Sequence, residues 1–425
     1  MLDINKIRQN PEEVKRGLLK KMDSVDFTEL LSWDKDCRAS IAEVEILKAK
    51  RNKVSAEIPE LKKAKKDVSS LMSEMKEIGE KIKALDETIA SFQTKIREFL
   101  EVLPNPADDD VIEGDKEQNK VVRTFGEKQN FSFKAKDHVE LATSLGLIDY
   151  KRGAKISGNG FWVYTGKGAL LEWGLLNYFI KEHLKDGFEY ILPPHILNYE
   201  SGYTAGQFPK FKDDVFRIEG SEKGQFLLPT AETPLANFYR DEIVPEEELP
   251  KKFFAYTPCY RSEAGSYRAS ERGMIRGHQF NKIEMFVYCV PEDSEAMLEL
   301  LVKKAEDLVN GLGLTFQVSK LASKDCSAAM AKTLDIEVWI PSMGEFKEVS
   351  SASKCRDYQA IRGNIRYKSK DTGKNAYLHT LNASGLATSR LFPAILEQFQ
   401  KEDGSVVVPK VLREWVGVDI LTPCK

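Results

Sequence analysis

The chain has 425 residues, a hydrophobic fraction of 42% and a net charge of −3, so it is long enough for more than one domain and apolar enough for a sizeable core. The slightly acidic balance excludes a chain-wide nucleic-acid-binding surface, and a polynucleotide would have to bind a local basic patch. No run of 18 apolar residues predicts a membrane span, and the first residues lack the apolar stretch of a secretion signal, so we expect a soluble, cytoplasmic protein.

Two common kinds of site lack their sequence signature. The six cysteines show no C-x-x-C spacing, so no structural zinc is expected. There is no G-x-x-x-x-G-K-[ST] segment and no G-x-G-x-x-G after a strand, which removes the main support for P-loop and dinucleotide-binding folds.

Residues 28–103 carry a coiled-coil pattern. Over residues 61–103 the apolar side chains recur at alternating spacings of three and four through six heptads, and the preceding segment shows the same spacing with two polar interruptions. Because Pro59 disfavours an uninterrupted helix, we predict an antiparallel pair of helices that turns between residues 59 and 70. Helices of about 35 residues extend roughly 50 Å, so the pair should project as an arm.

The predicted turn of this arm is strongly basic. Between residues 48 and 66 there are eight basic and two acidic residues. The basic residues are Lys48, Lys50, Arg51, Lys53, Lys62, Lys63, Lys65 and Lys66. A solvated coiled-coil face or a dimerisation element would look the same, but a basic tip on a slightly acidic protein favours binding to a polyanion.

An acidic, proline-bearing segment, P-N-P-A-D-D-D-V-I-E-G-D at residues 104–115, cannot continue the heptads and predicts a linker. We therefore expect an N-terminal domain at 1–103 and a second domain at 116–425. In the second domain, helices are predicted at residues 136–145 and 168–184, followed by a strand, F-E-Y-I-L, that ends at two prolines. An ordinary helix–strand unit of the core would give this pattern too.

Two segments then combine turn residues with polar side chains. Residues 203–211 read Y-T-A-G-Q-F-P-K-F, and residues 225–234 read Q-F-L-L-P-T-A-E-T-P. We expect Thr230 and Glu232 to share one face of a strand, because strand residues two apart point the same way. A T-x-E triplet by itself is chemically unremarkable.

Residues 253–290 predict a β-hairpin with a basic loop. Aromatic and β-branched residues dominate 253–260 and 280–290, and the loop at residues 264–277 carries three arginines and three glycines. Phe280 and Glu284 should lie on one face about 13 Å apart. A ring and a carboxylate at this spacing could hold a flat base and an amine, with arginines neutralising phosphate between them. A plain hairpin with solvated arginines is the alternative.

Two later segments also suggest chemistry. In G-E-F-K-E-V-S-S at residues 344–351, Glu348 and Ser351 supply the hard oxygen ligands that Mg²⁺ prefers, although an exposed strand edge would look the same. In H-T-L-N-A-S-G-L-A-T-S-R at residues 379–390, small residues precede a helix whose first turn carries Arg390. A helix N-terminus favours anions, but this could equally be a capped core helix.

Together these segments resemble the motifs of the seryl-tRNA synthetases, which are class II aminoacyl-tRNA synthetases. R-S-E and H-Q-F-N-K-I-E fall within motif 2 at about 253–290, and L-N-A-S-G-L-A-T-S-R within motif 3 at about 379–400. The helix, strand and prolines at about 168–195 resemble motif 1. The motifs, the T-A-E loop and the arm follow the family's order over nearly the whole chain. The sequence departs from the family's usual residues at Ala205, Phe208, Arg268 to Glu271, Lys354, Ile361 and Ala383.

The resemblance implies an α+β protein, in which an antiparallel α-helical coiled-coil arm precedes a six- to seven-stranded antiparallel sheet flanked by helices. It implies an ATP-dependent serine–tRNA ligase that forms seryl-adenylate and transfers it to the 3′ end of tRNA(Ser), with tRNA(Sec) as a further acceptor. The arm would bind the long variable arm of the tRNA, and motif 1 would build a homodimer. The implied cofactors are ATP, as co-substrate, and Mg²⁺.

The resemblance also assigns roles to individual residues. Arg261 and Arg390 would be catalytic, with Arg261 on the α-phosphate, Glu263 on the adenine amine and Phe280 stacked on the base. Arg276 and Arg390 would hold the β- and γ-phosphates. The implied serine-binding residues are Thr230, Ala231, Glu232, Glu284, Asn382 and Ser384. The implied ATP-binding residues are Arg261, Ser262, Glu263, Arg276, Phe280, Glu348, Val349, Ser350, Ser351 and Arg390, of which Glu348 and Ser351 would bind Mg²⁺.

Two other functions fit part of the sequence. A relative that charges a carrier protein would share the active site but usually lacks this arm. A coiled-coil tRNA-binding or scaffold protein with a decayed site is the non-enzymatic alternative. The residues that argue against decay are Arg261, Glu263, Glu284, Glu348 and Arg390.

Overall fold

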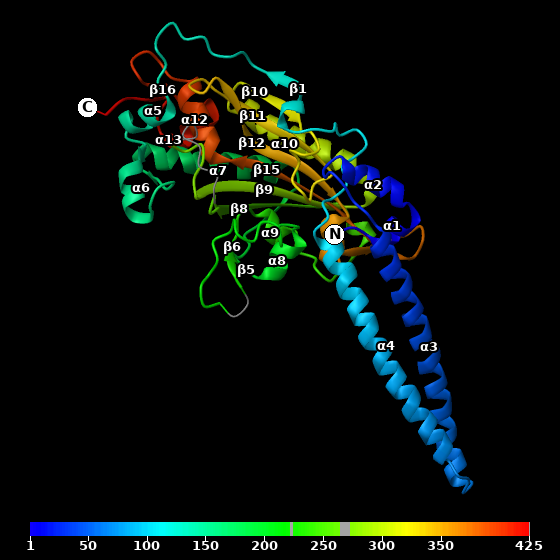
Figure 1. The fold of residues 1–425 in the computed structure, drawn as a ribbon. Helices are drawn as coiled ribbons and strands as arrows, with labels where there is room; N and C mark the ends of the chain where they lie inside the picture. The colour runs from blue at the N-terminus through cyan, green and yellow to red at the C-terminus, as the bar shows by residue number, and fades with distance from the viewer. Residues whose placement is uncertain (222–223, 264–272, 425) are drawn as a thin grey trace. The chain divides into compact units, whose positions relative to one another are not determined.

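The structure is a computed structural model that describes residues 1–221, 224–263 and 273–424 (Figure 1). Its contacts divide the chain into two compact units. We call Leu2–Lys15 with Asp23–Leu103 the arm unit, and Met1, Arg16–Met22 and Pro104–Lys425 the sheet unit. Among the described residues, no helix combines the length and apolar character that crossing a membrane requires.

The helices are α1 (Ile4–Gln9), α2 (Pro11–Leu19), α3 (Thr28–Lys63), α4 (Ser69–Glu101), α5 (His138–Ser144), α6 (Tyr150–Ser157), α7 (Gly166–Lys185), α8 (Tyr199–Thr204), α9 (Glu232–Leu235), α10 (Ser294–Gly311), α11 (Tyr358–Arg362), α12 (Thr388–Gln398) and α13 (Arg413–Val416). The strands of the main sheet are β1 (Lys120–Phe125), β4 (Glu189–Ile191), β8 (Lys251–Tyr260), β9 (Gln279–Cys289), β10 (Phe316–Lys320), β11 (Lys332–Ile340), β12 (Glu345–Arg356) and β15 (His379–Ala387). The short strands are β2 (Ile148–Asp149), β3 (Val163–Tyr164), β5 (Ile196–Leu197), β6 (Phe226–Leu227), β7 (Ile243–Pro245), β13 (Arg366–Lys368), β14 (Asn375–Tyr377), β16 (Val406–Val407) and β17 (Ile420–Leu421).

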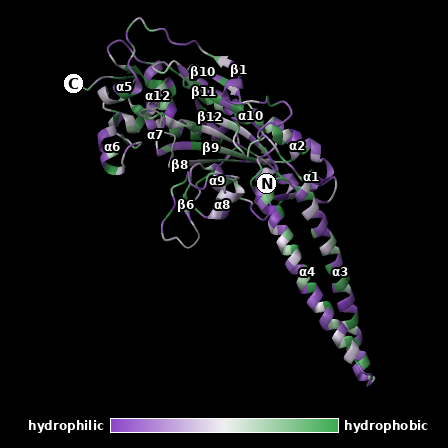
Figure 2. Ribbon diagram, in the orientation of Figure 1, coloured by the Kyte–Doolittle hydropathy of each residue, from purple (hydrophilic) through white to green (hydrophobic). Residues whose placement is uncertain are grey.

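The arm unit contains the predicted helical hairpin, α3 and α4 (Figure 1). Val44 of α3 packs with Ile78 and Ile82 of α4 in a buried cluster, as the heptad spacing predicts. Figure 2 shows apolar residues at intervals along both helices, between hydrophilic stretches. Pro59 lies inside α3, which continues through it to Lys63, so the proline does not end the helix. The chain still turns within the predicted interval, because α4 begins at Ser69.

The basic residues of the arm are distributed unevenly. Lys48 pairs with Asp86 of α4 at 3.7 Å, and Lys50 pairs with Glu74 at 2.5 Å, so these two charges are neutralised. The four lysines at and beside the turn are exposed, and they are Lys62, Lys63, Lys65 and Lys66. Four exposed lysines therefore gather at the turn of the arm.

The sheet unit is built on a sheet that has eight strands within the described residues, in the order β1-β10-β11-β12-β15-β9-β8-β4. Neighbouring strands are antiparallel except β4, which runs parallel to β8. The count exceeds the expected six to seven. The predicted hairpin forms from β8 and β9, with Cys259 opposite Phe280 and Ala255 opposite Glu284.

The two faces of this sheet have different chemistry, because successive strand residues point to opposite sides. On β9, Ile283, Met285 and Val287 belong to the main apolar core, which also contains side chains of α7, α10 and α12. The alternate residues Lys282 and Glu284 are buried on the other face. The sheet therefore covers its core on one side and presents polar side chains on the other.

Candidate active site

A cavity of about 870 Å³ lies in the sheet unit on the polar face of the sheet. Eleven of the residues implied by the sequence line it: Thr230, Glu232, Arg261, Glu263, Arg276, Glu284, Glu348, Ser351, Asn382, Ser384 and Arg390. A hollow of about 80 Å³ shares several of these residues and adds Phe280 and Val349. The structure thus brings together residues that lie up to 160 positions apart, from Thr230 to Arg390.

Three implied residues line neither cavity. Ala231 is fully buried beside Glu232. The hydroxyl of Ser262 donates to the carbonyl oxygen of Asp213 at 3.3 Å. The hydroxyl of Ser350 donates to the carbonyl oxygen of Ser384 at 2.6 Å, which ties β12 to β15. Arg268 and Arg272, in the loop of the hairpin, lie outside the described residues.

Thr230 and Glu232 do not share a strand face, and that expectation was wrong. Glu232 begins the short helix α9, and its backbone N–H donates to the Thr230 hydroxyl oxygen at 3.3 Å. A threonine hydroxyl that accepts from a nearby backbone N–H competes with a strand ladder, which explains the turn. Both side chains still face the same cavity.

The carboxylate of Glu232 is held by two side-chain amides. Its Oε1 accepts from Nε2 of Gln359 at 2.8 Å and from Nδ2 of Asn382 at 3.0 Å. Burial, reinforced by the negative charge of Glu284, raises the pKa of Glu232 to about 7. A carboxylate that is desolvated and oriented in this way can bind a small cation strongly.

Lys282 is a buried cation to which sequence reasoning assigned no role. Its Nζ pairs with the Glu284 carboxylate and donates to Oγ1 of Thr230 at 2.7 Å. Oγ1 of Thr230 lies 3.4 Å from Oε2 of Glu284. The lysine thereby neutralises one of the two acids at this end of the cavity and orients Thr230.

Sequence reasoning also missed Gln359, Asp335 and Glu337. Gln359 lies on α11, where its Oε1 accepts from the Thr380 hydroxyl at 2.7 Å while its amide holds Glu232. Asp335 and Glu337 lie on β11 and line the cavity. Their signal was the alternation of acids in L-D-I-E-V-W, which puts both on one face.

The arginines lie around the smaller hollow, which neither Glu232 nor Glu284 lines. The guanidinium of Arg261 lies over the Phe280 ring at 5.2 Å, and its Nε donates to the carbonyl oxygen of Pro229 at 3.3 Å. Arg276 pairs with Glu263. Arg390 donates to the Glu348 carbonyl oxygen at 2.7 Å and lies 3.5 Å from its carboxylate. Planar guanidinium groups can bind phosphates, and an aromatic ring beside them can stack on a base, so this group of residues suits a nucleoside triphosphate.

The residues around Glu348 fit a divalent cation. Glu348, Ser351 and Asp335 all line the cavity and offer oxygen atoms, the ligands that Mg²⁺ prefers. Oδ1 of Asp335 is buried and, within the described part of the chain, has no hydrogen-bond partner. Burial and the Glu348 charge raise the pKa of Asp335 well above its usual range. A cation here would offset that concentration of negative charge.

Comparison with known proteins identifies the family. Residues 1–107 match the seryl-tRNA synthetase N-terminal domain, and residues 216–399 match the tRNA synthetase class II core domain (G, H, P, S and T). The chain is 63% identical to serine–tRNA ligase 2 of Clostridium acetobutylicum, covering 99% of this chain and 100% of the relative. It is 45% identical to the serine–tRNA ligase of Geobacillus kaustophilus, covering 98% and 99%.

Solved structures agree with this match over the full length. The seryl-tRNA synthetase of Pyrococcus horikoshii complexed with ATP superposes with a TM-score of 0.92 at 34% identity, covering 100% of both chains. The cytoplasmic serine–tRNA ligase of Naegleria fowleri in complex with AMP gives a TM-score of 0.88 at 26% identity, covering 100% of this chain and 99% of that one. The chain therefore belongs to the seryl-tRNA synthetase family of class II, ATP-dependent aminoacyl-tRNA ligases.

Proposed function

We propose that this chain activates L-serine with ATP to form seryl-adenylate and transfers the seryl group to the 3′-terminal adenosine of tRNA(Ser). The observation that carries the proposal is that the cavity joins two groups of charged residues. Glu232 and Glu284 line the cavity, whereas Arg261 and Arg390 also line the adjoining hollow beside Phe280, which neither of the two acids lines; we call these the acidic end and the basic end. The two ends match two substrates, one with an ammonium group and the other with a triphosphate.

Serine binds at the acidic end in this proposal. Its α-ammonium group lies against Glu232, and its hydroxyl is held by Glu284 and Thr230. Asn382 and Ser384 complete the pocket. A site built to hydrogen-bond a hydroxyl rejects alanine strongly, because its buried polar groups would be left unpaired, whereas threonine is excluded by its bulk.

ATP binds at the basic end, with the adenine against Phe280 and its amine near Glu263. In the first step the serine carboxylate oxygen attacks the α-phosphorus in line, a carboxyl–phosphate bond forms and pyrophosphate leaves. Arg261 stabilises the charge that develops on the α-phosphate, while Arg276 and Arg390 hold the departing phosphates. Catalysis by positioning and electrostatic stabilisation needs no protein nucleophile.

Mg²⁺ would be held by Glu348 and Ser351. It would supply a positive charge that screens the triphosphate and stabilises the leaving pyrophosphate. The Arg390 guanidinium lies 3.5 Å from the Glu348 carboxylate, and both side chains line the cavity.

In the second step a hydroxyl of the terminal adenosine of tRNA attacks the seryl carbonyl carbon, and AMP leaves. The exposed lysines at the turn of the arm bind the tRNA backbone in this proposal. The proposal includes tRNA(Sec) as a second acceptor, and a homodimer built on α7. The arm disfavours the carrier-protein alternative, because a small carrier does not need a long basic helical hairpin.

A two-stage assay of the full-length chain tests the function. We expect serine-dependent exchange of labelled pyrophosphate into ATP, with alanine and threonine as weak substrates, and charging of tRNA(Ser) in the second stage. Transcripts of tRNA(Sec) and a carrier protein serve as competing acceptors. Exchange with another amino acid would reject the serine assignment, and charging of the carrier protein alone would reject the tRNA assignment. The absence of any exchange would favour the scaffold function.

A further inference from the structure

A β-bulge lies in β12 next to the proposed serine site. The pairing of β12 with β15 shifts between Lys354 and Arg356, and Arg356 has a φ of +49°. A non-glycine residue in this left-handed region carries backbone strain, which persists only where the surroundings hold it. The structure must therefore contain groups that fix the bulge.

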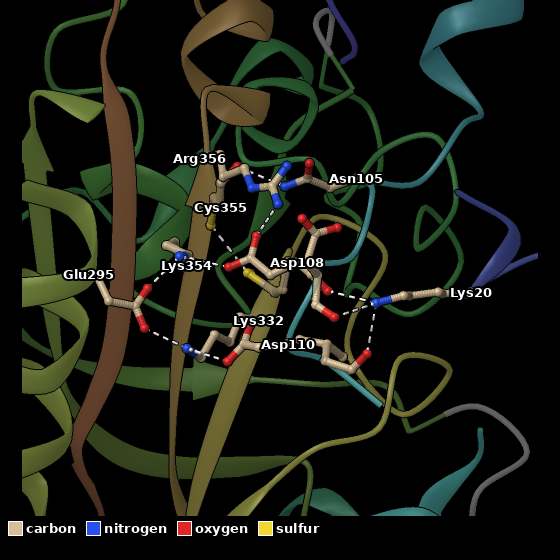
Figure 3. Close-up of polar contacts among 12 residues, drawn as sticks. Lys20, Asn105, Asp108, Asp110, Glu295, Lys332, Lys354, Cys355 and Arg356 are labelled. Carbon is tan, nitrogen blue, oxygen red and sulfur yellow. Dashed lines mark hydrogen bonds and ion pairs between the residues drawn. The ribbon is translucent and has the colours of Figure 1, made fainter. Parts of the chain in front are cut away.

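Those groups are Asn105 and Asp108, which lie in the segment just after Leu103, the last residue of the arm unit. The carboxylate of Asp108 bridges the two ends of the bulge, pairing with Lys354 at 2.6 Å and with Arg356 (Figure 3). Nδ2 of Asn105 donates to the carbonyl oxygen of Cys355, between them, at 2.7 Å. Each residue of the bulge thus has a partner in the segment.

This attachment is buried and braced. Asp108 is only 7% exposed and Asn105 only 2%. Lys20 donates from its Nζ to the backbone oxygen of Asp108 at 3.0 Å, which fixes the peptide that carries the carboxylate. Burial would raise the pKa of Asp108, but the charges of Arg356 and Lys354 outweigh it and lower the pKa below its usual range. The bridge is therefore ionised at neutral pH.

The bulge in turn positions the two residues whose side-chain amides donate hydrogen bonds to Glu232. Sγ of Cys355 lies 3.7 Å from Nδ2 of Asn382, which donates to Oε1 of Glu232. Immediately after the bulge the chain enters α11, whose second residue, Gln359, donates to the same oxygen. Both amide donors to Glu232 therefore depend on the path of the chain through residues 354–356.

We propose that Asp108 is a positioning residue for the amino-acid site, which fixes the bulge so that Gln359 and Asn382 hold Glu232 in the orientation that binds the α-ammonium group. The inference rests on the proposed function, because that function assigns the ammonium group to Glu232. Asp108 lies outside every motif on which the family resemblance depends, and it touches neither the amino acid nor ATP.

The test compares Asp108→Asn with Asp110→Asn in the full-length chain. Asp110 is a matched control, since it lies two residues further along and also bridges two lysines, Lys320 at 2.5 Å and Lys332 at 2.9 Å. For D108N we expect the KM for serine in pyrophosphate exchange to rise about tenfold, the lower end of what loss of an outer-shell partner costs at metal sites. The KM for ATP should change less than twofold, and D110N should leave both values unchanged.

Two further variants make the test specific for the bulge. D108E should restore most of the serine affinity, because it keeps the charge. Glycine adopts a positive φ without strain, so in an R356G background the further change D108N should alter the KM for serine less than twofold. If D108N does not fold, R356G and the double variant R356G/D108N carry the test, and a tenfold higher KM for serine in the double variant than in R356G would then overturn the proposal.

The outcomes separate this inference from the proposed function. A wild-type chain without serine-dependent exchange would reject the function. A wild-type chain that exchanges normally, with a folded D108N variant whose KM for serine is unchanged or whose two KM values rise equally, would reject only the positioning role of Asp108.

Discussion

Oε1 of Glu232 and Nδ2 of Asn382 lie 3.0 Å apart, although 150 residues separate them in the chain. Glu232 begins α9, after the turn at Thr230, and Asn382 lies on β15 in the middle of the sheet. The hydrogen bond orients a buried carboxylate toward the cavity.

The pH dependence of serine use should report Glu232. Burial raises its pKa to about 7, and serine binding requires the ionised form, so kcat/KM for serine should fall about tenfold per unit as the pH drops below 7. The KM for ATP should not follow this profile. The measurement is pyrophosphate exchange at limiting serine between pH 5.5 and 8.5, and a flat profile across pH 7 would contradict the assignment.

The raised pKa of Glu232 also predicts how the stability of the fold changes with pH. The pKa of Glu232 is higher in the folded chain than the ordinary 4.5, so the free energy of unfolding should decrease as the pH rises from about 4.5 to 7 and the buried carboxyl ionises. Replacement by glutamine removes this cost. E232Q should therefore be more stable than the wild type at pH 8 and nearly equal to it at pH 5, as measured by urea unfolding.

Removal of the Lys282 charge should destabilise the folded chain. Lys282→Met leaves Glu284 buried without its cation, which should lower the free energy of unfolding by about 3–5 kcal/mol. Lys303 is the control, because it pairs with Asp307 on the surface, where loss of a pair costs at most about 1 kcal/mol. Equal losses in K282M and K303M, measured by urea unfolding, would refute the argument.

Arg261 should not tolerate lysine. Lysine keeps the charge but loses the planar fork and the position over Phe280, so R261K should lower kcat for exchange about 100-fold, as removal of a transition-state donor does. The KM for serine should change little. Arg413→Lys is a matched control, since Arg413 pairs with Asp419 at 3.3 Å at the surface. If R261K retains more than a third of wild-type kcat, Arg261 does not clamp the α-phosphate.

The turn of the arm should matter for charging and not for exchange. Reversal to glutamate of Lys62, Lys63, Lys65 and Lys66 should reduce kcat/KM for tRNA(Ser) more than tenfold at low salt and weaken its salt dependence, because fewer counterions are released from the tRNA. Serine-dependent exchange should be unchanged. Lys76→Glu, at an exposed position on the shaft of α4, should leave charging intact. Parallel losses of charging and exchange would contradict a tRNA-binding role.

The outer surface of α7 should mediate the proposed dimer. Trp173 is 54% exposed and Leu170 is 47% exposed on this helix. Exposure of large apolar side chains to water is unfavourable, and a patch of them indicates a protein–protein contact. A charge at this position would oppose burial, so Trp173→Glu should convert a dimer to a monomer in sedimentation or light scattering. A wild-type chain that is monomeric at micromolar concentration, or a W173E variant that remains dimeric, would rule out this interface.

The sequence by itself determined the elements whose signal is local. The heptads of residues 61–103 predicted α4, and the alternation along residues 280–290 predicted which side chains of β9 face the cavity. These predictions succeed because a helix or a strand repeats its side-chain direction every few residues, whatever the rest of the chain does. Most of the site residues were reached through the family's motifs, which are likewise continuous in sequence.

Only the tertiary structure decided which partners those residues have. Gln359 and Lys282 were assigned no role from the sequence, yet they bind Glu232 and Glu284. The turn at Thr230 replaced an expected strand, and Asp108 in a presumed linker holds a strained bulge in β12. The physical reason is that buried polar groups must find partners wherever the strand order brings them, and the pairing of β12 with β15 and of β15 with β9 joins segments that are distant in the sequence.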